Sequence, residues 1–211
     1  MMRKLRAETL PARFLRSILA GDLAASLAVA REARAHGLPF LYEEVVRWAL
    51  VEVGRCWEDG SLSVADEHVA TAIAQSVLAS QYPSFPWAPE GPKGVVACVA
   101  GERHELGARM AADLLAYDGW NVRFVGADVP QDALVELVTR EHPRFIGLSA
   151  SLPERMSRLH ETIARLRGVV PASKLVVGGR VVGSIDSQSL DVDAVAPSAS
   201  GAVELIRSWK P

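Results

Sequence analysis

Cysteine is scarce in this sequence, which holds only Cys56 and Cys98 among its 211 residues. The two are 42 positions apart, and neither belongs to a CxxC pair or to a Cys/His cluster. This excludes a zinc finger and a thioredoxin-type redox site. A chain of this length can bury a hydrophobic core without disulfides or structural metals, so the small stapled scaffolds are excluded as well.

An excess of one charge is also absent. The chain carries 23 Lys and Arg against 25 Asp and Glu, for a formal net charge of −2. Proteins that bind DNA through its phosphates usually present a strong positive field. We therefore expect no direct nucleic-acid binding.

Long hydrophobic runs are missing too. No segment approaches the roughly 18 consecutive apolar residues of a membrane-spanning helix, and the N-terminal residues are too polar for the core of a signal peptide. The composition, 49% hydrophobic and 23% charged, is typical of a folded globular protein. We expect a cytoplasmic protein with no membrane segment.

The first 81 residues show apolar side chains at spacings of three and four, which predicts helices. Asp22 is a good N-cap, and Ser63 followed by Asp66 has the pattern of a capping box. Four helices are expected, over residues 9–20, 23–35, 39–57 and 63–81. The sequence therefore predicts an N-terminal four-helix bundle over residues 1–81.

Residues 82–93 contain four prolines and are expected to link two domains. Beyond them, over residues 94–211, short β-branched runs alternate with helical stretches, which predicts an α/β domain with a five-stranded parallel sheet of the Rossmann-like (flavodoxin-like) type. The expected strands are 94–100, 121–127, 145–150, 174–179 and 193–198. The expected helices are 105–118, 131–141, 154–168 and 200–209.

Ligands bind such folds at the carboxyl ends of the strands. His104 follows the first strand, and Glu102 can hydrogen-bond the ring nitrogen that faces away from a metal. Ser149 and Ser151 follow the third strand, and Gly178 and Gly179 the fourth. Each feature has a simpler interpretation: a solvated helix start, a helix cap and a tight turn.

Taken together, these residues resemble the fingerprint of cobalamin-binding domains, Asp-x-His-x-x-Gly, Ser-x-Leu and Gly-Gly. The gaps agree, with 41 residues between Gly107 and Ser149 and 26 between Ser151 and Gly178. Two residues depart from the fingerprint: Glu102 replaces Asp, and Ser151 replaces Leu. The resemblance covers residues 92–211.

The resemblance implies a cofactor bound base-off, in which the benzimidazole leaves cobalt and His104 becomes the lower axial ligand. The nucleotide tail would lie in a slot beside the sheet. Cofactor contacts are then expected from Glu102, Arg103, His104, Gly107, Ser149, Ser151, Gly178 and Gly179.

The helical half adds a second resemblance. Trp57 precedes Glu67-His68 by nine intervening residues, a pattern found in CarH-like, light-responsive cobalamin regulators, where it lies over the upper face of the cofactor. Val64 shares one side of the expected helix with the Glu-His pair. The alternatives are a core aromatic for Trp57, a helix-dipole acid for Glu67 and a surface residue for His68.

Two departures affect this second resemblance. The histidine that follows the tryptophan in those photoreceptors is Glu58 here, which leaves His68 as the candidate upper cobalt ligand. His36, His142 and His160 are expected at the surface. Those regulators also carry a winged-helix DNA-binding domain, and we expect none in this chain.

We therefore expect a light-sensing regulatory module, a binding and switching protein rather than an enzyme, in which photolysis of the upper carbon–cobalt bond changes the helical cap. The expected cofactor is adenosylcobalamin, with methyl- and hydroxocobalamin as alternatives. A homo-oligomer and a protein partner are expected for output. The alternative function is the corrinoid methyl-carrier protein of a methyltransferase system. A Rossmann domain for another nucleotide is disfavoured because no GxGxxG loop follows the first strand.

Overall fold

The computed structural model describes residues 8–181 and 190–210. By the contacts within it, the chain divides into two compact units, Met1–Ser84 and Phe85–Pro211. No helix within the described ranges combines the length and the apolar composition needed to cross a membrane.

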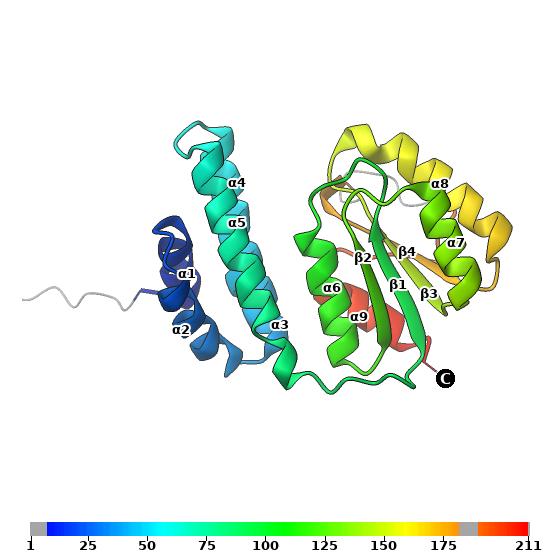
Figure 1. Cartoon of the computed structure of the whole chain (residues 1–211), viewed down its shortest axis with the longest axis horizontal. Coiled ribbons are helices and arrows are strands. Elements are labelled where there is room, and N and C mark those ends of the chain that lie inside the picture. The colour runs from blue at the N-terminus through cyan, green and yellow to red at the C-terminus, as the bar shows by residue number, and fades with distance from the viewer. Residues whose placement is uncertain (1–7, 182–189, 211) are drawn as a thin grey trace, which may run out of the picture. The chain divides into compact units, whose positions relative to one another are not determined.

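The first unit is helical (Figure 1). Its described elements are α1 (Leu10–Leu19), α2 (Leu23–Arg34), α3 (Leu38–Phe40), a π-helical segment η1 (Leu41–Arg47), α4 (Trp48–Glu58), α5 (Val64–Ala79) and a short 3-10 turn η2 (Tyr82–Ser84). The segments α3, η1 and α4 follow one another without a break, so four helical rods are formed, as the sequence predicts.

Side chains fix the ends and the packing of these helices. The Asp22 carboxylate accepts the Ala25 N–H at 2.9 Å, and the Ser63 hydroxyl accepts the Asp66 N–H at 3.2 Å, so both predicted caps form. Helix α1 packs against α2, η1, α4 and α5. The core is apolar and fully buried, with Phe14, Ile18, Leu38, Leu41, Tyr42, Val45, Val46, Ala49 and Val77. The apolar spacing alone did not predict the π-helical turn.

The second unit is built on a parallel sheet (Figure 1). Its described strands are β1 (Lys93–Cys98), β2 (Asn121–Gly126), β3 (Phe145–Ser149), β4 (Lys174–Gly178) and β5 (Ala194–Val195), in the order β2-β1-β3-β4-β5. All strand pairs are parallel, so their carboxyl ends meet at one edge. The order reverses between β1 and β3, which places the switch point of the sheet there.

Helices cover both faces of the sheet, as predicted. The helices α6 (Leu106–Tyr117) and α9 (Ala199–Arg207) pack together on one face, and α7 (Gln131–Glu141) and α8 (Met156–Val169) pack together on the other (Figure 1). A 3-10 turn η3 (Pro153–Arg155) precedes α8. The core under α7 and α8 includes Val95, Leu134, Ile146, Leu148, Leu159, Ile163 and Val177. Strand β5 is only two residues long, shorter than the predicted 193–198, and Ser198 caps α9 by accepting the Gly201 N–H.

Part of the proline-rich segment packs on the second unit. Phe85 is buried, and its ring lies 5.7 Å from that of Tyr117 in α6. Asn121 donates a side-chain hydrogen bond to the Pro89 carbonyl at 2.6 Å. Phe85 and Pro89 therefore attach this segment to α6 and β2.

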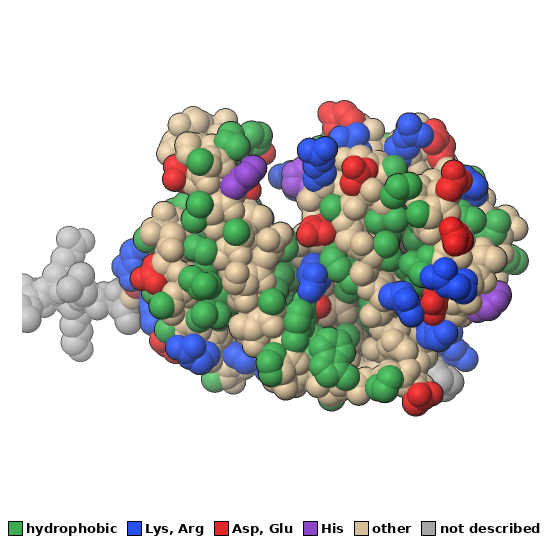
Figure 2. Space-filling model, viewed as in Figure 1, with side chains coloured by type: hydrophobic (Ala, Val, Ile, Leu, Met, Phe, Trp, Pro, Cys, Tyr) green, Lys and Arg blue, Asp and Glu red, His purple; other side chains and the backbone are tan. Residues whose placement is uncertain are grey.

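Many charged side chains of the second unit lie beside side chains of opposite charge. Figure 2 shows Lys and Arg side chains interspersed with Asp and Glu on the viewed face of this unit. Arg207 lies 2.6 Å from Asp118, and hydrogen bonds and ion pairs from Arg207 and Lys210 hold the pKa of that carboxyl below its usual range against the opposing effect of burial. These contacts attach the C-terminal helix to the end of α6.

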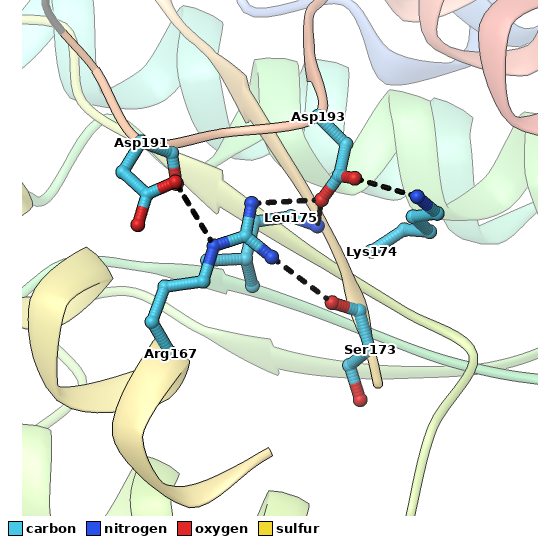
Figure 3. Close-up of polar contacts among 6 residues, drawn as sticks. All are labelled: Arg167, Ser173, Lys174, Leu175, Asp191 and Asp193. Atoms are coloured by element: carbon cyan, nitrogen blue, oxygen red, sulfur yellow. Dashed lines mark hydrogen bonds and ion pairs between the residues drawn. The ribbon is translucent and has the colours of Figure 1, made fainter. Parts of the chain in front are cut away.

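A charged network secures the return of the chain into β5 (Figure 3). The Asp193 carboxylate lies 2.8 Å from Arg167 Nη2 and 2.7 Å from Lys174 Nζ, and accepts the Leu175 N–H at 2.9 Å. Burial would raise the pKa of Asp193, but these three donors together lower it to about 2. Since only 19% of this side chain is exposed, the network stabilises the folded state.

We expect Asp193→Asn to lower the free energy of unfolding by about 2 kcal/mol at pH 7. The folded-state pKa of Asp193 is depressed, so its contribution is present above the unfolded value and is lost as the pH falls through about 2. At pH 3 the difference from the wild type should shrink to about half. Urea denaturation at pH 7 and pH 3 measures the difference in the free energy of unfolding between the variant and the wild type. Asp191→Asn is the matched control, because Asp191 is 79% exposed and lies 3.5 Å from Arg167; an equal loss in that variant would contradict the assignment.

Candidate functional site

The ends of three adjacent strands form one row at the carboxyl edge of the sheet. Cys98 pairs in register with Ser149, and Ser149 pairs with Gly178. The loops that follow β1, β3 and β4 therefore begin side by side, next to the switch point. This is the place where a doubly wound sheet binds its ligand.

The loop after β1 is fixed by the loop after β2. Gly101 has a φ of +80°, and its N–H donates to the Asp128 carboxylate at 2.5 Å. The Asp128 N–H in turn donates to the Glu102 carbonyl at 2.8 Å. These two bonds hold the backbone on both sides of Glu102.

Glu102 joins two of the loops. Its side chain is fully buried, and its Oε1 accepts both the backbone N–H of His104 at 2.7 Å and a hydrogen bond from His104 Nδ1 at 2.6 Å. Its Oε2 accepts the Ser151 N–H at 2.6 Å. Burial opposes the charge of Glu102, but the donors from His104 and Ser151 outweigh it and lower the pKa of this carboxyl. Glu102 is therefore an ionised hub between the β1 and β3 loops.

This contact decides which nitrogen of His104 is free. An ionised carboxylate accepts hydrogen bonds only, so the proton of the neutral ring lies on Nδ1. The unprotonated Nε2 then carries the lone pair, on a side chain that is 55% exposed. A carboxylate at one nitrogen and a free second nitrogen is the usual arrangement of a metal-ligating histidine.

The serines at this edge have different surroundings. Ser149 is buried and hydrogen-bonded with the thiol of Cys98, while burial and the nearby charges of Glu102 and Glu105 raise the pKa of that thiol to about 12. Ser151 contributes its backbone N–H to Glu102. Since any residue except proline supplies that N–H, the replacement of Leu by Ser at this position preserves the contact.

The three glycines of the pattern differ in how much space a side chain would have. Gly179 has a φ of +104°, and a Cβ there would lie 2.0 Å from the Ala150 carbonyl oxygen, so the packing of the chain itself requires glycine. A Cβ on Gly178 would make ordinary contact with Ala196. A Cβ on Gly107, in the first turn of α6, would meet nothing within 4 Å. Open space beside Gly107 leaves room for a ligand.

The predicted residues of the helical unit lie near the turn between α4 and α5. Trp57, at the end of α4, is 48% exposed, so it is not a core aromatic. Val64 is also exposed, in the first turn of α5. Glu67 Oε2 lies 2.5 Å from Nδ1 of His68, and its Oε1 accepts the Thr71 hydroxyl at 2.8 Å. The His68 side chain is 74% exposed. Glu67 therefore occupies Nδ1 of His68, as Glu102 does for His104, and leaves Nε2 available.

Two models of the B12 binding domain match this chain, one over residues 92–207 and the other over residues 10–80. The chain belongs to the B12-binding family. It is therefore a cobalamin-binding-domain protein, and its cofactor is a corrinoid.

Relatives of this B12-binding protein include two kinds of protein. It is 34% identical over 139 residues to the HTH-type transcriptional repressor CarH of Myxococcus xanthus, a match that covers 65% of this chain and 46% of that protein. The chain thus spans about half the length of this repressor.

The chain is also 26% identical over 188 residues to trimethylamine corrinoid protein 1 of Methanosarcina acetivorans, a match that covers 85% of this chain and 87% of that protein. The solved structure of the Methanosarcina barkeri monomethylamine corrinoid protein has the same fold, with a TM-score of 0.78, 17% identity and coverage of 94% and 97%.

The residues at the sheet edge fit a corrinoid. The free Nε2 of His104 is a ligand that cobalt accepts, and the open space at Gly107 lies three residues further along the chain, in the first turn of α6. Within this B12-binding chain, Glu102, His104 and Ser151 are joined by hydrogen bonds, and Cys98, Ser149 and Gly178 by strand register. Arg103 is exposed on the same loop and makes no ion pair or hydrogen bond with its side chain among the described residues.

The remaining histidines lie where the sequence predicted. His36, His142 and His160 are all exposed. His142 ends α7 with a φ of +48°. None of them is hydrogen-bonded to a carboxylate within the described part of the chain, in contrast to His68 and His104.

Two residues of the site were not predicted from the sequence. Asp128 braces the His104 loop, and the available signal was its place directly after the second strand at the same edge. Arg155 lies on Gly101: a Cβ on that glycine would be 2.8 Å from Arg155 Nη1. Its signal is weaker, because charged residues are common at the start of a helix.

Proposed function

We propose that this protein is a cobalamin-dependent, light-sensing regulatory module. When bound, adenosylcobalamin supplies a light-sensitive carbon–cobalt bond. His104 would hold the cobalt from below in place of the benzimidazole, and Trp57, Val64, Glu67 and His68 would face the upper group. Loss of that group in light would change the helical unit and, through it, the surface offered to another copy or to a partner.

The observation that carries this proposal is the contact between Glu67 and His68, in the helix that follows the half-exposed Trp57. The Glu67 carboxylate is held by Thr71 and occupies Nδ1 of His68, so the second nitrogen is available as a ligand. Since Glu58 follows Trp57, we propose His68 as the side chain that takes the upper position after illumination. The 34% sequence identity to the transcriptional repressor CarH supports a regulatory role.

A second candidate is a corrinoid methyl carrier. It is favoured by the match to trimethylamine corrinoid protein 1, which covers 85% of this chain and 87% of that protein. His104 would hold the cobalt in the same way, the upper position would carry a methyl group, and the partner would be a methyltransferase. His68 would then have no role as a ligand.

An illumination experiment separates the two candidates. Purified protein is loaded in darkness with adenosyl-, methyl- or hydroxocobalamin, and its absorption spectrum and oligomeric state are measured before and after green light. We expect adenosylcobalamin to give a spectral change together with a change in oligomeric state. Photolysis without any change in oligomeric state or partner affinity would instead favour the methyl carrier. No spectral shift with any of the three cofactors would contradict both candidates.

The His68→Ala variant refines the experiment. If His68 takes the upper position, the spectrum of His68→Ala in darkness should match that of the wild type. Only the spectrum of the variant after illumination should differ. His36→Ala is the matched control, because His36 is also exposed in the same unit and makes no hydrogen bond to a carboxylate within the described chain. An unchanged photoproduct in His68→Ala would remove His68 as the upper ligand.

A further inference from the structure

Two arginines of the second unit differ from its other basic residues. Within residues 85–181 and 190–210, Arg103 and Arg155 are the only Lys or Arg side chains that make no hydrogen bond or ion pair with an acceptor. Both lie at the carboxyl edge of the sheet, beside the His104 loop. The uncompensated cations of this unit are therefore concentrated at the proposed cofactor site.

Arg155 is the more constrained of the two. It ends η3, and its guanidinium packs on Gly101, where a Cβ would lie 2.8 Å from Nη1 and 3.1 Å from Cζ. Its Nε is buried and has no hydrogen-bond partner. An unsatisfied buried donor is costly, and such groups usually have a partner in the functional state. Arg103, by contrast, is exposed to solvent.

The neighbouring acids do not supply that partner. The oxygens of Glu102 accept hydrogen bonds from His104 and Ser151, and Asp128 accepts the Gly101 N–H. Neither carboxylate lies within ion-pair distance of Arg155. The guanidinium is held in place by packing on glycine while its charge remains available to an anion.

We propose that Arg155 binds the phosphodiester of the cobalamin nucleotide tail. This rests on the proposed base-off binding of cobalamin. The amide side chains of the corrin ring are neutral, so the phosphodiester is the anionic group of the cofactor's periphery, and the planar guanidinium suits phosphate oxygens. Arg155 would thereby select corrinoids that carry a nucleotide tail over those that lack it.

The test compares hydroxocobalamin with cobinamide, which has the same corrin ring and no nucleotide tail. Arg155→Ala should weaken cobalamin binding about tenfold and leave cobinamide binding unchanged. Arg155→Lys, which keeps the charge without the planar fork, should give a smaller loss. Added salt should weaken wild-type binding of cobalamin more than binding by Arg155→Ala. Arg158→Ala is the matched control, because Arg158 is exposed on the following turn and pairs with Glu161 at 3.0 Å.

Three results would overturn the inference. Equal losses for cobalamin and cobinamide would assign Arg155 to the corrin ring, and unchanged cobalamin binding by a folded Arg155→Ala would assign it to packing on Gly101. A wild-type protein that binds no cobalamin would overturn the proposed function and this inference together. The first two results leave the proposed function intact, so the two failures are distinguishable.

Discussion

Replacing His104 by alanine should abolish base-off binding of cobalamin. The free Nε2 of His104 is the ligand that we propose for the lower face, and it lies on a side chain that is 55% exposed. Without it, the cofactor's own benzimidazole has no competitor for cobalt. We expect the bound cofactor to show the spectrum of the free base-on form, and the Kd to rise by at least about a hundredfold, or about 3 kcal/mol.

The control for this variant is His160→Ala, which removes an exposed histidine from α8 in the same unit. Its spectrum and Kd should equal those of the wild type. Far-UV circular dichroism checks that His104→Ala is folded, which we expect because the side chain is half exposed and its loss leaves Glu102 with two backbone N–H donors. A His104→Ala protein with an unchanged base-off spectrum would show that another group binds the cobalt.

The fold could be predicted from the sequence because its determinants are local. Helix caps such as Asp22 and Ser63 act within a few residues, and both form as expected. The switch from helical spacing to short β-branched runs marks the start of the second unit. Parallel strands joined by helices must present their carboxyl ends at one edge, which is why the order of strands and helices along the chain was enough to place His104, Ser149 and Gly178 together.

The contacts that organise the site are long-range, and for that reason they could not be predicted. The hydrogen bond between Glu102 and Ser151 joins residues 49 positions apart in the sequence, and the one between Asp128 and Gly101 joins residues 27 positions apart. Both contacts depend on how neighbouring loops turn after leaving the sheet, which apolar periodicity does not encode. The same holds for Arg155 on Gly101.

The helical unit has a similar limit. The apolar residues between Leu38 and Val53 predict a helix. They are buried in the structure, but the helix that carries them includes a π-helical segment at Leu41–Arg47. A pattern of buried positions therefore specified the helix and left its local winding undetermined.

Glu102 positions His104 at the edge of the sheet through hydrogen bonds. Three N–H groups converge on its two oxygens, two from His104 and one from Ser151. Since its pKa is lowered, its stabilising contribution is present above the ordinary range of a glutamate and is lost as the pH falls through the lowered value. Removing the charge should therefore affect folding and cofactor binding together.

We expect Glu102→Gln to lower the free energy of unfolding by about 1–3 kcal/mol and to weaken cobalamin binding by about 10–100-fold. The amide oxygen can accept the two His104 donors, but the amide nitrogen then faces the Ser151 N–H, so two donors oppose each other in a fully buried place. Urea denaturation and cobalamin titration measure the two effects. Glu102→Asp is the matched control, because it keeps the charge and restores the residue usual in the cobalamin-binding fingerprint; it should retain base-off binding. Equal losses in the Gln and Asp variants would show that side-chain length, and not charge, positions His104.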